Sequence, residues 1–211
     1  MKAHTSETQA TITPEKALDI LKEGNTRFVN NLKANRDLLA QVNDTRAGQW
    51  PFAVVLSCID SRTSAELIFD QGLGDIFSVR IAGNFVNQDI LGSMEFGCNV
   101  AGSKLVVVLG HSKCGALKGG LDAAAIEGLG MDNLNHLVGH FDPIIKNIMK
   151  DGEERSSKNT DLLERLNHHN VLNAIEHIRK ESSTLRNMEE EGKIKIVGAN
   201  YDVETGSVVF L

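Results

Sequence analysis

Two continuous apolar runs constrain the fold of this chain more than any other feature of its sequence. Residues 52–57 (FAVVLS) and 105–109 (LVVVL) lack the alternation of polar and apolar side chains that is typical of a half-solvated strand. A third segment, 76–84 (IFSVRIAGN), is rich in β-branched and aromatic residues, and residues 120–190 are mostly helical and charged. Buried strands that alternate with helices indicate an α/β fold, in which helices flank a mostly parallel central β-sheet.

The ends of the chain predict a helical arm at the N-terminus and a strand at the C-terminus. Residues 1–12 are polar, and we expect them to be flexible. Thr13 and Pro14 suit the N-cap and the first position of a helix, and apolar side chains recur at helical spacing after them. A turn near residues 204–206 separates two short C-terminal strands. Since no linker and no internal repeat is visible, residues 1–211 are predicted to form a single domain.

The charge and the cysteine content argue against several classes of function. The chain carries a formal net charge of −6 and has a sequence pI of about 5.6, with no basic cluster, so we expect no nucleic-acid partner. Three cysteines are too few for a disulfide framework, and they fit a reducing compartment. No apolar run approaches the length of a membrane span or forms a secretory signal. We therefore expect a cytoplasmic protein without a membrane partner.

Chemically reactive side chains follow both apolar runs. Cys58, Asp60 and Arg62 come directly after the first run, and His111 and Cys114 come after the second. Adjacent parallel strands bring their carboxyl ends together at one crevice, so two thiols and one imidazole can converge there. Two cysteines and one histidine, with a fourth position left open, are a ligand set of catalytic rather than structural zinc.

The sequence CIDSR at 58–62, combined with HSKC at 111–114, resembles the zinc motif pair of the β-class carbonic anhydrases, Cys-x-Asp-x-Arg and His-x-x-Cys. The resemblance is specific up to about residue 120 and again near the C-terminus, while the helical stretch between carries no motif of the family. It implies the α/β fold of that family and a homodimer or homotetramer with its sites at a dimer interface. Further matching segments are LKEGNTRF, GDIFSVRIAGN, GSMEFG and YDVETGSVVFL.

The resemblance implies a zinc lyase that converts carbon dioxide reversibly to bicarbonate and a proton. Cys58, His111 and Cys114 would bind Zn²⁺, which lowers the pKa of bound water from about 15.7 toward about 7, so that hydroxide attacks carbon dioxide near neutrality. Asp60 would accept a hydrogen bond from that water, and Arg62 would keep Asp60 ionised and oriented. In a closed state that the family allows, Asp60 would itself be a fourth zinc ligand.

The resemblance also assigns a substrate pocket and favours one subtype of the family. The subtype whose Asp can bind the metal has a Trp where this chain has Val55, so the plant-like subtype with an open zinc position is favoured. Ile81 and Phe96 depart from the polar residues that the family has at two positions of the pocket region. The substrate-binding positions implied by the resemblance are Gln49, Phe77, Ala82 and Gly115.

Three other functions stay open. The resemblance also allows a hydrolase of carbonyl sulfide or carbon disulfide on the same zinc site. A non-catalytic zinc-binding module is a second alternative, which the intact Asp60 and Arg62 argue against. An enzyme that uses Cys114 as nucleophile with His111 is a third, and it would need no stoichiometric zinc. We expect Cys98 in the core, and no functional role follows from the sequence for His4, His136, His140, His168, His169 and His177.

Overall fold

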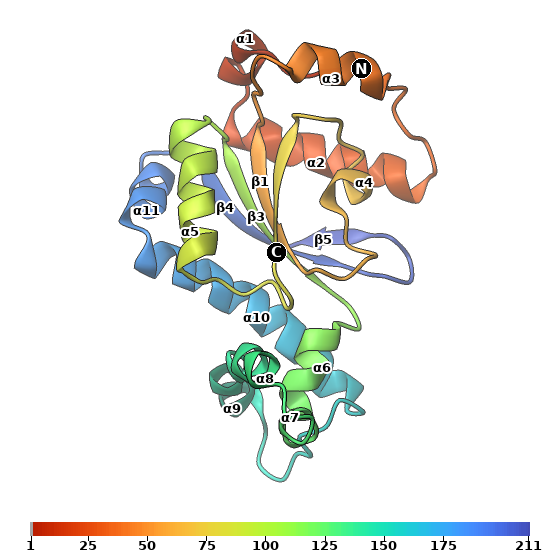
Figure 1. Ribbon diagram of the computed structural model, residues 1–211, viewed down its shortest axis with the longest axis vertical. Coiled ribbons are helices and arrows are strands. Elements are labelled where there is room, and N and C mark those ends of the chain that lie inside the picture. The colour runs from red at the N-terminus through yellow and green to blue at the C-terminus, as the bar shows by residue number, and fades with distance from the viewer. Residues whose placement is uncertain (1) are drawn as a thin grey trace.

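The computed structural model describes residues 2–211 and contains a five-stranded sheet with helices on both faces (Figure 1). The strand order is β2-β1-β3-β4-β5; the first four strands run parallel, and β5 pairs antiparallel with β4. This arrangement confirms the predicted α/β fold with a mostly parallel central sheet. The strands are β1 (Ala53–Ser57), β2 (Ile76–Arg80), β3 (Leu105–His111), β4 (Lys195–Tyr201) and β5 (Val208–Phe210).

Strands β1 and β3 lie side by side in the interior of the sheet, and every one of their residues is buried. Successive side chains point to opposite faces of the sheet. Val54 and Val106 therefore pack into one core cluster, and Val55 and Val107 into the other. This burial on both faces explains why the two segments are continuously apolar. Because the strands pair in parallel register up to Ser57 and Leu109, their carboxyl ends finish at the same edge of the sheet.

Helices on each face bury the side chains that the strands present to them. Leu21 and Phe69 fill the core on one face, and Met94 and Ile178 fill the core on the other. A Cβ atom on Gly97 would lie 2.5 Å from Val54 Cγ2, so the small residue lets its helix pack directly on β1. The first face carries α2 (Pro14–Val29) and α4 (Ala65–Ile68); the second carries α5 (Gln88–Glu95), the π-helical turn η1 (Phe96–Val100), α10 (Thr160–Glu181) and α11 (Ser183–Glu190).

The N-terminal arm contains more helix than the sequence analysis foresaw. Residues 2–12, for which we expected flexibility, include the short helix α1 (Ser6–Ala10). The Gln9 side chain donates hydrogen bonds to the carbonyl oxygens of Pro51 (2.7 Å) and Ala101 (2.8 Å). These long-range contacts hold α1 against the loops at the amino ends of the strands, an arrangement that a polar local sequence does not reveal.

The predicted start of the next helix is confirmed. The Thr13 side chain caps α2 by accepting a hydrogen bond from the backbone N–H of Lys16 (3.2 Å), and Pro14 occupies the first helical position. A further helix, α3 (Leu38–Thr45), follows α2 and completes the arm. Figure 1 shows α1 and α3 beyond the end of the sheet at which β1 begins.

A buried carboxylate ties the segment after α2 to the body of the protein. Asp70 accepts hydrogen bonds from Arg27 Nε (2.6 Å), Arg36 Nη1 (2.6 Å) and the backbone N–H of Ala34 (3.1 Å). Burial by itself raises the pKa of Asp70, but these hydrogen bonds outweigh it and lower the pKa below its ordinary value. The carboxylate is therefore ionised at neutral pH and bridges two arginines.

The C-terminal hairpin confirms the predicted turn and final strand. Gly206 has a φ of 78°, in the left-handed region that glycine adopts without strain. The Asn25 side chain of α2 donates to the carbonyl of Gly206 (2.9 Å) and accepts from the backbone N–H of Val208 (2.9 Å). The hairpin is thus fixed to α2 as well as to β4.

Four short helices lie beyond the carboxyl ends of the strands (Figure 1). Leu117 and Phe141 are completely buried in a core that these helices share with Leu166 of α10. Cys58 and Cys114 belong to the same buried cluster, so the helices enclose the edge of the sheet where the predicted metal ligands lie. They are α6 (Gly115–Leu121), α7 (Ala123–Glu127), α8 (Asp132–Gly139) and α9 (Asp142–Ile148).

Helix α10 connects this helical cluster with the sheet. It is 22 residues long, and its buried face contacts both β3 and β4 as well as α9. The opposite face carries charged side chains, as expected of a helix that packs on a sheet and faces solvent. Within residues 2–211, no helix combines the length and the apolar composition needed to cross a bilayer.

Candidate metal centre

The three predicted metal ligands converge at the carboxyl edge of the sheet. Cys58 directly follows β1, His111 is the last residue of β3, and Cys114 is the N-cap of α6. All three residues are buried, and their ligand atoms lie within 4.8 Å of one another. The two sulfur atoms are 3.9 Å apart. The parallel pairing of β1 with β3 therefore positions a Cys, a His and a second Cys to bind a metal ion.

A left-handed residue allows one turn to supply two of these ligands. Lys113 has a φ of 58°, which is uncommon for a residue with a side chain. This conformation turns the chain sharply between His111 and Cys114, so that both side chains face the same point. The Lys113 ammonium forms an ion pair with Glu204, which ties the turn to the C-terminal hairpin.

The histidine is fixed in the tautomer that a metal requires. His111 Nδ1 lies 2.9 Å from the carbonyl oxygen of Ser112, so Nδ1 carries the proton and donates it to that carbonyl. His111 Nε2 is then a free acceptor, and it is buried with no hydrogen-bond partner among residues 2–211. A buried lone pair without a partner is unfavourable unless a cation binds it, so this atom fits a metal ligand.

The electrostatics of the two thiols also fit a cation. The hydrogen bond from Cys114 lowers the pKa of Cys58, and the backbone N–H of Gly83, 3.3 Å from the Cys58 sulfur, lowers it further. The pKa of Cys114 is raised, because it shares a proton with Cys58 and is buried. Two buried thiolates this close repel each other, and a divalent cation between them removes the repulsion.

Asp60 and Arg62 form an ion pair beside the three ligands. Three hydrogen bonds from Arg62 hold the carboxylate: one from Nε to Oδ1 (2.9 Å), one from Nη2 to Oδ2 (2.7 Å) and one from the backbone N–H to Oδ1 (2.9 Å). The side-chain hydrogen bonds from Arg62 hold the pKa of Asp60 well below its usual range, although partial burial raises it. Asp60 is therefore ionised and fixed in direction near neutral pH.

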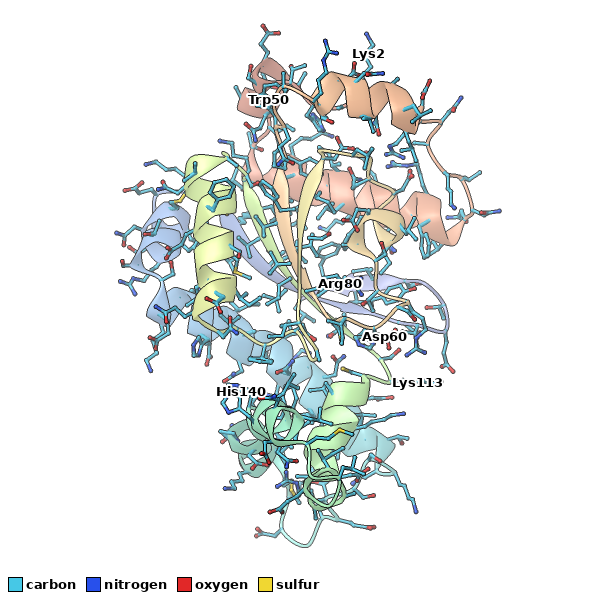
Figure 2. All side chains as sticks on the ribbon, viewed as in Figure 1. Lys2, Trp50, Asp60, Arg80, Lys113 and His140 are labelled. Atoms are coloured by element: carbon cyan, nitrogen blue, oxygen red, sulfur yellow. The ribbon has the colours of Figure 1, made fainter. Side chains whose placement is uncertain are left out.

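Arg80 supports the loop that carries these residues, a role that the sequence analysis did not foresee. Its guanidinium donates from Nε to the carbonyl of Cys58 (2.9 Å) and from Nη2 to the carbonyl of Asp60 (2.6 Å). The Thr63 hydroxyl donates to the same two carbonyls, at 3.0 Å and 2.8 Å. Figure 2 shows Arg80, Asp60 and Lys113 at the same end of the sheet. Because Arg80 is the residue paired with Ser57, only the strand register reveals this contact.

An apolar cavity of about 290 Å³ opens beside the metal centre. Ala82 and Gly115, two of the predicted pocket residues, line it together with Cys58 and Asp60. The far wall comes from α7 and α8, in the stretch where the sequence offered no motif. Its side chains are Ile126, Leu134, Leu137 and Val138.

The other two predicted pocket residues lie away from this cavity within one chain. A Cβ atom on Gly74, which precedes β2, would lie 3.8 Å from Gln49 Cβ, so Gln49 lies near the amino end of the sheet. In Figure 2, Trp50, its neighbour, lies beyond the opposite end of the sheet from Asp60. Phe77 lies in the edge strand β2 and contacts Phe96, with ring centroids 6.2 Å apart.

Comparison with known proteins connects this geometry to one family. A family model described as carbonic anhydrase matches residues 53–208. Carbonic anhydrase 2 of Mycobacterium tuberculosis is 35% identical over 200 residues, which cover 93% of this chain and 92% of that protein. The carbonic anhydrase of Mycolicibacterium smegmatis is 46% identical over 112 residues, which cover 52% of this chain and 54% of that protein. The solved structure of the β-carbonic anhydrase CcaA superposes with a TM-score of 0.71 at 25% identity, covering 92% of this chain and 86% of that chain.

Proposed function

Since this chain belongs to the β-class carbonic anhydrases, we propose that it hydrates carbon dioxide reversibly to bicarbonate and a proton on a bound Zn²⁺ ion. The observation that carries the proposal is the convergence of Cys58, His111 and Cys114 beside an ionised Asp60. Thiolate and neutral imidazole are donors that zinc prefers, and three protein ligands leave one position for water or substrate.

The residues around the metal divide the chemistry between them. When bound, Zn²⁺ acidifies water from a pKa of about 15.7 to about 7, so that the nucleophile is present near neutral pH. Asp60 would accept a hydrogen bond from this nucleophile and direct it towards carbon dioxide. Arg62 keeps Asp60 ionised and prevents it from rotating. The carbonyl of Ser112 holds the His111 tautomer in place.

The cavity suits a small uncharged substrate. Carbon dioxide carries no net charge, so it needs apolar walls and proximity to the nucleophile rather than a charged binding group. The side chains from α7 and α8 supply those walls, and Ala82 and Gly115 leave space near the metal because they are small. Bicarbonate, which is charged and strongly hydrated, is disfavoured in such a cavity and is released to solvent.

The geometry of Asp60 favours the open subtype. Both of its carboxylate oxygens accept hydrogen bonds from Arg62, and one accepts a third bond from the Arg62 backbone. For Asp60 to bind the metal it would have to give up these bonds. We propose that Asp60 stays on Arg62 near neutral pH and that the fourth zinc position is left to water or substrate.

We further propose that the active form is a homodimer or a homotetramer, in which Gln49 and Phe77 complete the metal site of a neighbouring chain. These two residues do not reach the cavity of their own chain, although the family resemblance assigns them to the pocket. The edge strand β2 and the neighbouring Phe96, which is 54% exposed, are available to a partner. Helix α3 also exposes Leu38, Leu39 and Val42.

We propose a cytoplasmic location and a single domain over residues 1–211. Cys58, Cys98 and Cys114 are all free thiols, which is the state that a reducing compartment maintains. The metal ligands and the core clusters draw on both halves of the chain, so no part of it contains the site alone.

Stopped-flow hydration of carbon dioxide, followed with a pH indicator, tests the reaction. We expect activity that a zinc chelator removes and that added Zn²⁺ restores. Activity that persists in fully metal-free protein would instead favour the cysteine-nucleophile alternative. Parallel assays with carbonyl sulfide and carbon disulfide identify the substrate, and turnover of these alone would overturn the proposal.

The buried cysteines provide a matched pair of variants for the metal assignment. Cys114→Ala is expected to lose both zinc and activity, because it removes one of three ligands. Cys98→Ala is the control: Cys98 is equally buried, and burial raises its pKa to about 12, but it lies outside the ligand group. Full zinc content in Cys114→Ala, measured by elemental analysis, would contradict the assignment.

A further inference from the structure

A main-chain hydrogen bond reaches the sulfur of Cys58 from the loop that follows β2. The backbone N–H of Gly83 lies 3.3 Å from Cys58 Sγ, and the contact is buried. Cys58 is one of the three candidate metal ligands, so this donor acts on an atom that would bind the metal. The direction of the N–H depends on what fixes the conformation of Gly83.

Gly83 adopts a backbone conformation that its neighbours have to stabilise. Its φ of 76° lies in the left-handed region, and the next residue, Asn84, has a φ of 42°. Glycine has more backbone conformations available than any other residue, so by itself it does not hold its N–H in one direction. A larger residue cannot stiffen the turn, because a Cβ atom on Gly83 would lie 2.4 Å from Phe141 Cζ.

The peptide unit that follows Gly83 is held at both of its polar atoms. The Gly83 carbonyl accepts a hydrogen bond from Asn170 Nδ2 of α10 (2.8 Å). The N–H of Asn84 donates to the carbonyl of Ile81 (3.0 Å), which closes the turn. Because the carbonyl and the N–H belong to one rigid plane, the two hydrogen bonds fix the orientation of that plane. The bond from Asn170 is the one that anchors the turn to another element.

Asn170 is a polar residue on the buried face of α10. It is 1% exposed, and the next buried positions of the helix, Val171 and Ala174, are apolar. Leaving a buried amide or carbonyl without a partner is unfavourable, so the hydrogen bond between Asn170 and Gly83 is maintained in the folded protein. The side chain lies in the helical stretch where the sequence offered no motif, and the fold shows what it contacts.

We propose that Asn170 is a positioning residue of the metal centre, which acts through Gly83 on the sulfur of Cys58. Hydrogen bonds to the ligands of a metal orient them and tune the metal. A hydrogen bond to a thiolate takes up part of the charge on the sulfur, so the bound ion keeps more of its positive charge. This contribution matters in a site with two thiolates, which together reduce that charge. The inference rests on the proposed function, because it needs a metal ion on Cys58.

Substitution of the metal by Co²⁺ gives a readout of the Cys58 sulfur that does not depend on turnover. Charge transfer from thiolate sulfur to Co²⁺ absorbs in the near ultraviolet, and a hydrogen bond to the sulfur raises the energy of this transition. Asn170→Leu removes the donor and keeps a side chain of similar size. We expect its charge-transfer band at a longer wavelength than in the wild type.

Competition with a chromogenic chelator measures the affinity for Zn²⁺ in the same variant. Loss of a hydrogen bond that supports a metal ligand weakens metal binding by about 10–100-fold, and we expect a change of this size in Asn170→Leu. Asn170→Ala removes the same donor without adding apolar bulk, and it should show the same band shift and the same loss of affinity. Thermal unfolding of the metal-loaded proteins identifies the variants that are folded.

Asn167 supplies the matched control on the same helix. It is also buried, at 9% exposed, but its Nδ2 donates to Asn200 Oδ1 of β4 (3.0 Å) rather than to the Gly83 turn. Asn167→Ala should therefore lower the melting temperature while leaving the charge-transfer band and the zinc affinity unchanged. This variant separates the loss of a buried hydrogen bond in general from the loss of the one that acts on Cys58.

An unchanged band and affinity in both Asn170 variants, or the same changes in Asn167→Ala, would overturn the inference. In a protein that hydrates carbon dioxide, that result would leave the proposed reaction untouched. A band shift confined to the Asn170 variants, in a protein that hydrates no carbon dioxide, would support the inference and contradict only the reaction.

Discussion

Arg62 donates hydrogen bonds to both carboxylate oxygens of Asp60, with Nε 2.9 Å from Oδ1 and Nη2 2.7 Å from Oδ2. A planar guanidinium makes this two-point contact, whereas a lysine ammonium acts as a single point charge. Asp60 and Arg62 lie two and four residues beyond Cys58, so the loop that begins at this candidate metal ligand also orients the carboxylate. Because the guanidinium donors and the carboxylate acceptor are already fixed, the protein does not have to reorganise them when the substrate reacts.

We expect Asp60→Asn to retain zinc and to lower kcat by about 100-fold or more, as is typical when a positioned proton acceptor is lost. Arg62→Lys should also lower kcat, because a single donor group does not hold both carboxylate oxygens. Stopped-flow kinetics with parallel zinc analysis measures both effects. Wild-type kcat in Asp60→Asn would show that the carboxylate has no part in the reaction.

The buried ion pairs of Asp70 predict a loss of stability in acid. The pKa of Asp70 is lower in the folded protein than its unfolded value of about 3.9. The contribution of ionised Asp70 to the free energy of unfolding is therefore fully present above about pH 4. It is lost as the pH falls through the folded-state pKa. Asp70→Asn should lower the free energy of unfolding by about 2 kcal/mol at pH 7. This is less than the roughly 3–5 kcal/mol lost when a fully buried ion pair is broken, because Arg27 is partly exposed.

Urea denaturation of Asp70→Asn and wild type between pH 7 and about pH 3 measures this difference, which should shrink at the acid end. Asp161→Asn is the control, since Asp161 is 69% exposed in its pair with Arg165 and should contribute much less. A constant difference across the whole pH range would mean that Asp70 stabilises the fold without its charge.

Two glycines near the metal should respond differently to alanine. Gly83 has a φ of 76°, and a Cβ there would lie 2.4 Å from Phe141 Cζ. Gly83→Ala should therefore cost about 1–3 kcal/mol of stability through overpacking. Gly115 lines the cavity, and a Cβ there meets no atom within 4 Å. Gly115→Ala should keep the wild-type melting temperature and lower kcat/KM by narrowing the cavity. Equal melting temperatures for the two variants would contradict this reasoning.

Subunit mixing tests whether two chains share each site. Phe77→Ala keeps the metal ligands and lacks the pocket side chain, whereas Cys114→Ala lacks the metal and keeps Phe77. A heterodimer of the two contains one site with metal ligands from one chain and Phe77 from the other. Refolding the variants together should give more activity than the sum of the two refolded separately. Strict additivity, in a mixture shown to contain heterodimers, would place Phe77 outside the partner's site.

The central sheet and the metal ligands follow from local sequence patterns. Strands that are buried on both faces must be continuously apolar, so β1 and β3 are recognisable without knowledge of their neighbours. The chemistry of the side chains adds a second constraint on the site. Two thiols and one imidazole at the ends of two parallel strands form a typical set of metal ligands. The convergence of Cys58, His111 and Cys114 was therefore predictable from the sequence, and the structure brings the three candidate ligands together.

Contacts between distant segments were not predictable in this way. Helix α1 is held by Gln9, whose partners are remote in the sequence, and Arg80 reaches the Cys58 loop only because β2 pairs with β1. The cavity wall on α7 and α8 consists of ordinary apolar residues, which look like core residues until the fold shows that they border a space. Phe77 and Gln49 are the opposite case, because their assignment rests on family resemblance and they lie far from the cavity of their own chain.

Cys58 and Cys114 are separated by 56 positions in the chain, yet their sulfur atoms lie 3.9 Å apart. The intervening residues form a complete strand, β2, and the helices on either side of it before β3 returns next to β1. To pair in parallel, β1 and β3 must first close the long loop between them, which costs chain entropy before the contacts of the pair can compensate for it. Such a pair of strands therefore forms slowly. A newly synthesised chain therefore has no full ligand set until its central sheet has assembled. We therefore expect the metal ion to bind late in folding, so that its uptake by a refolding chain would report when β1 and β3 meet.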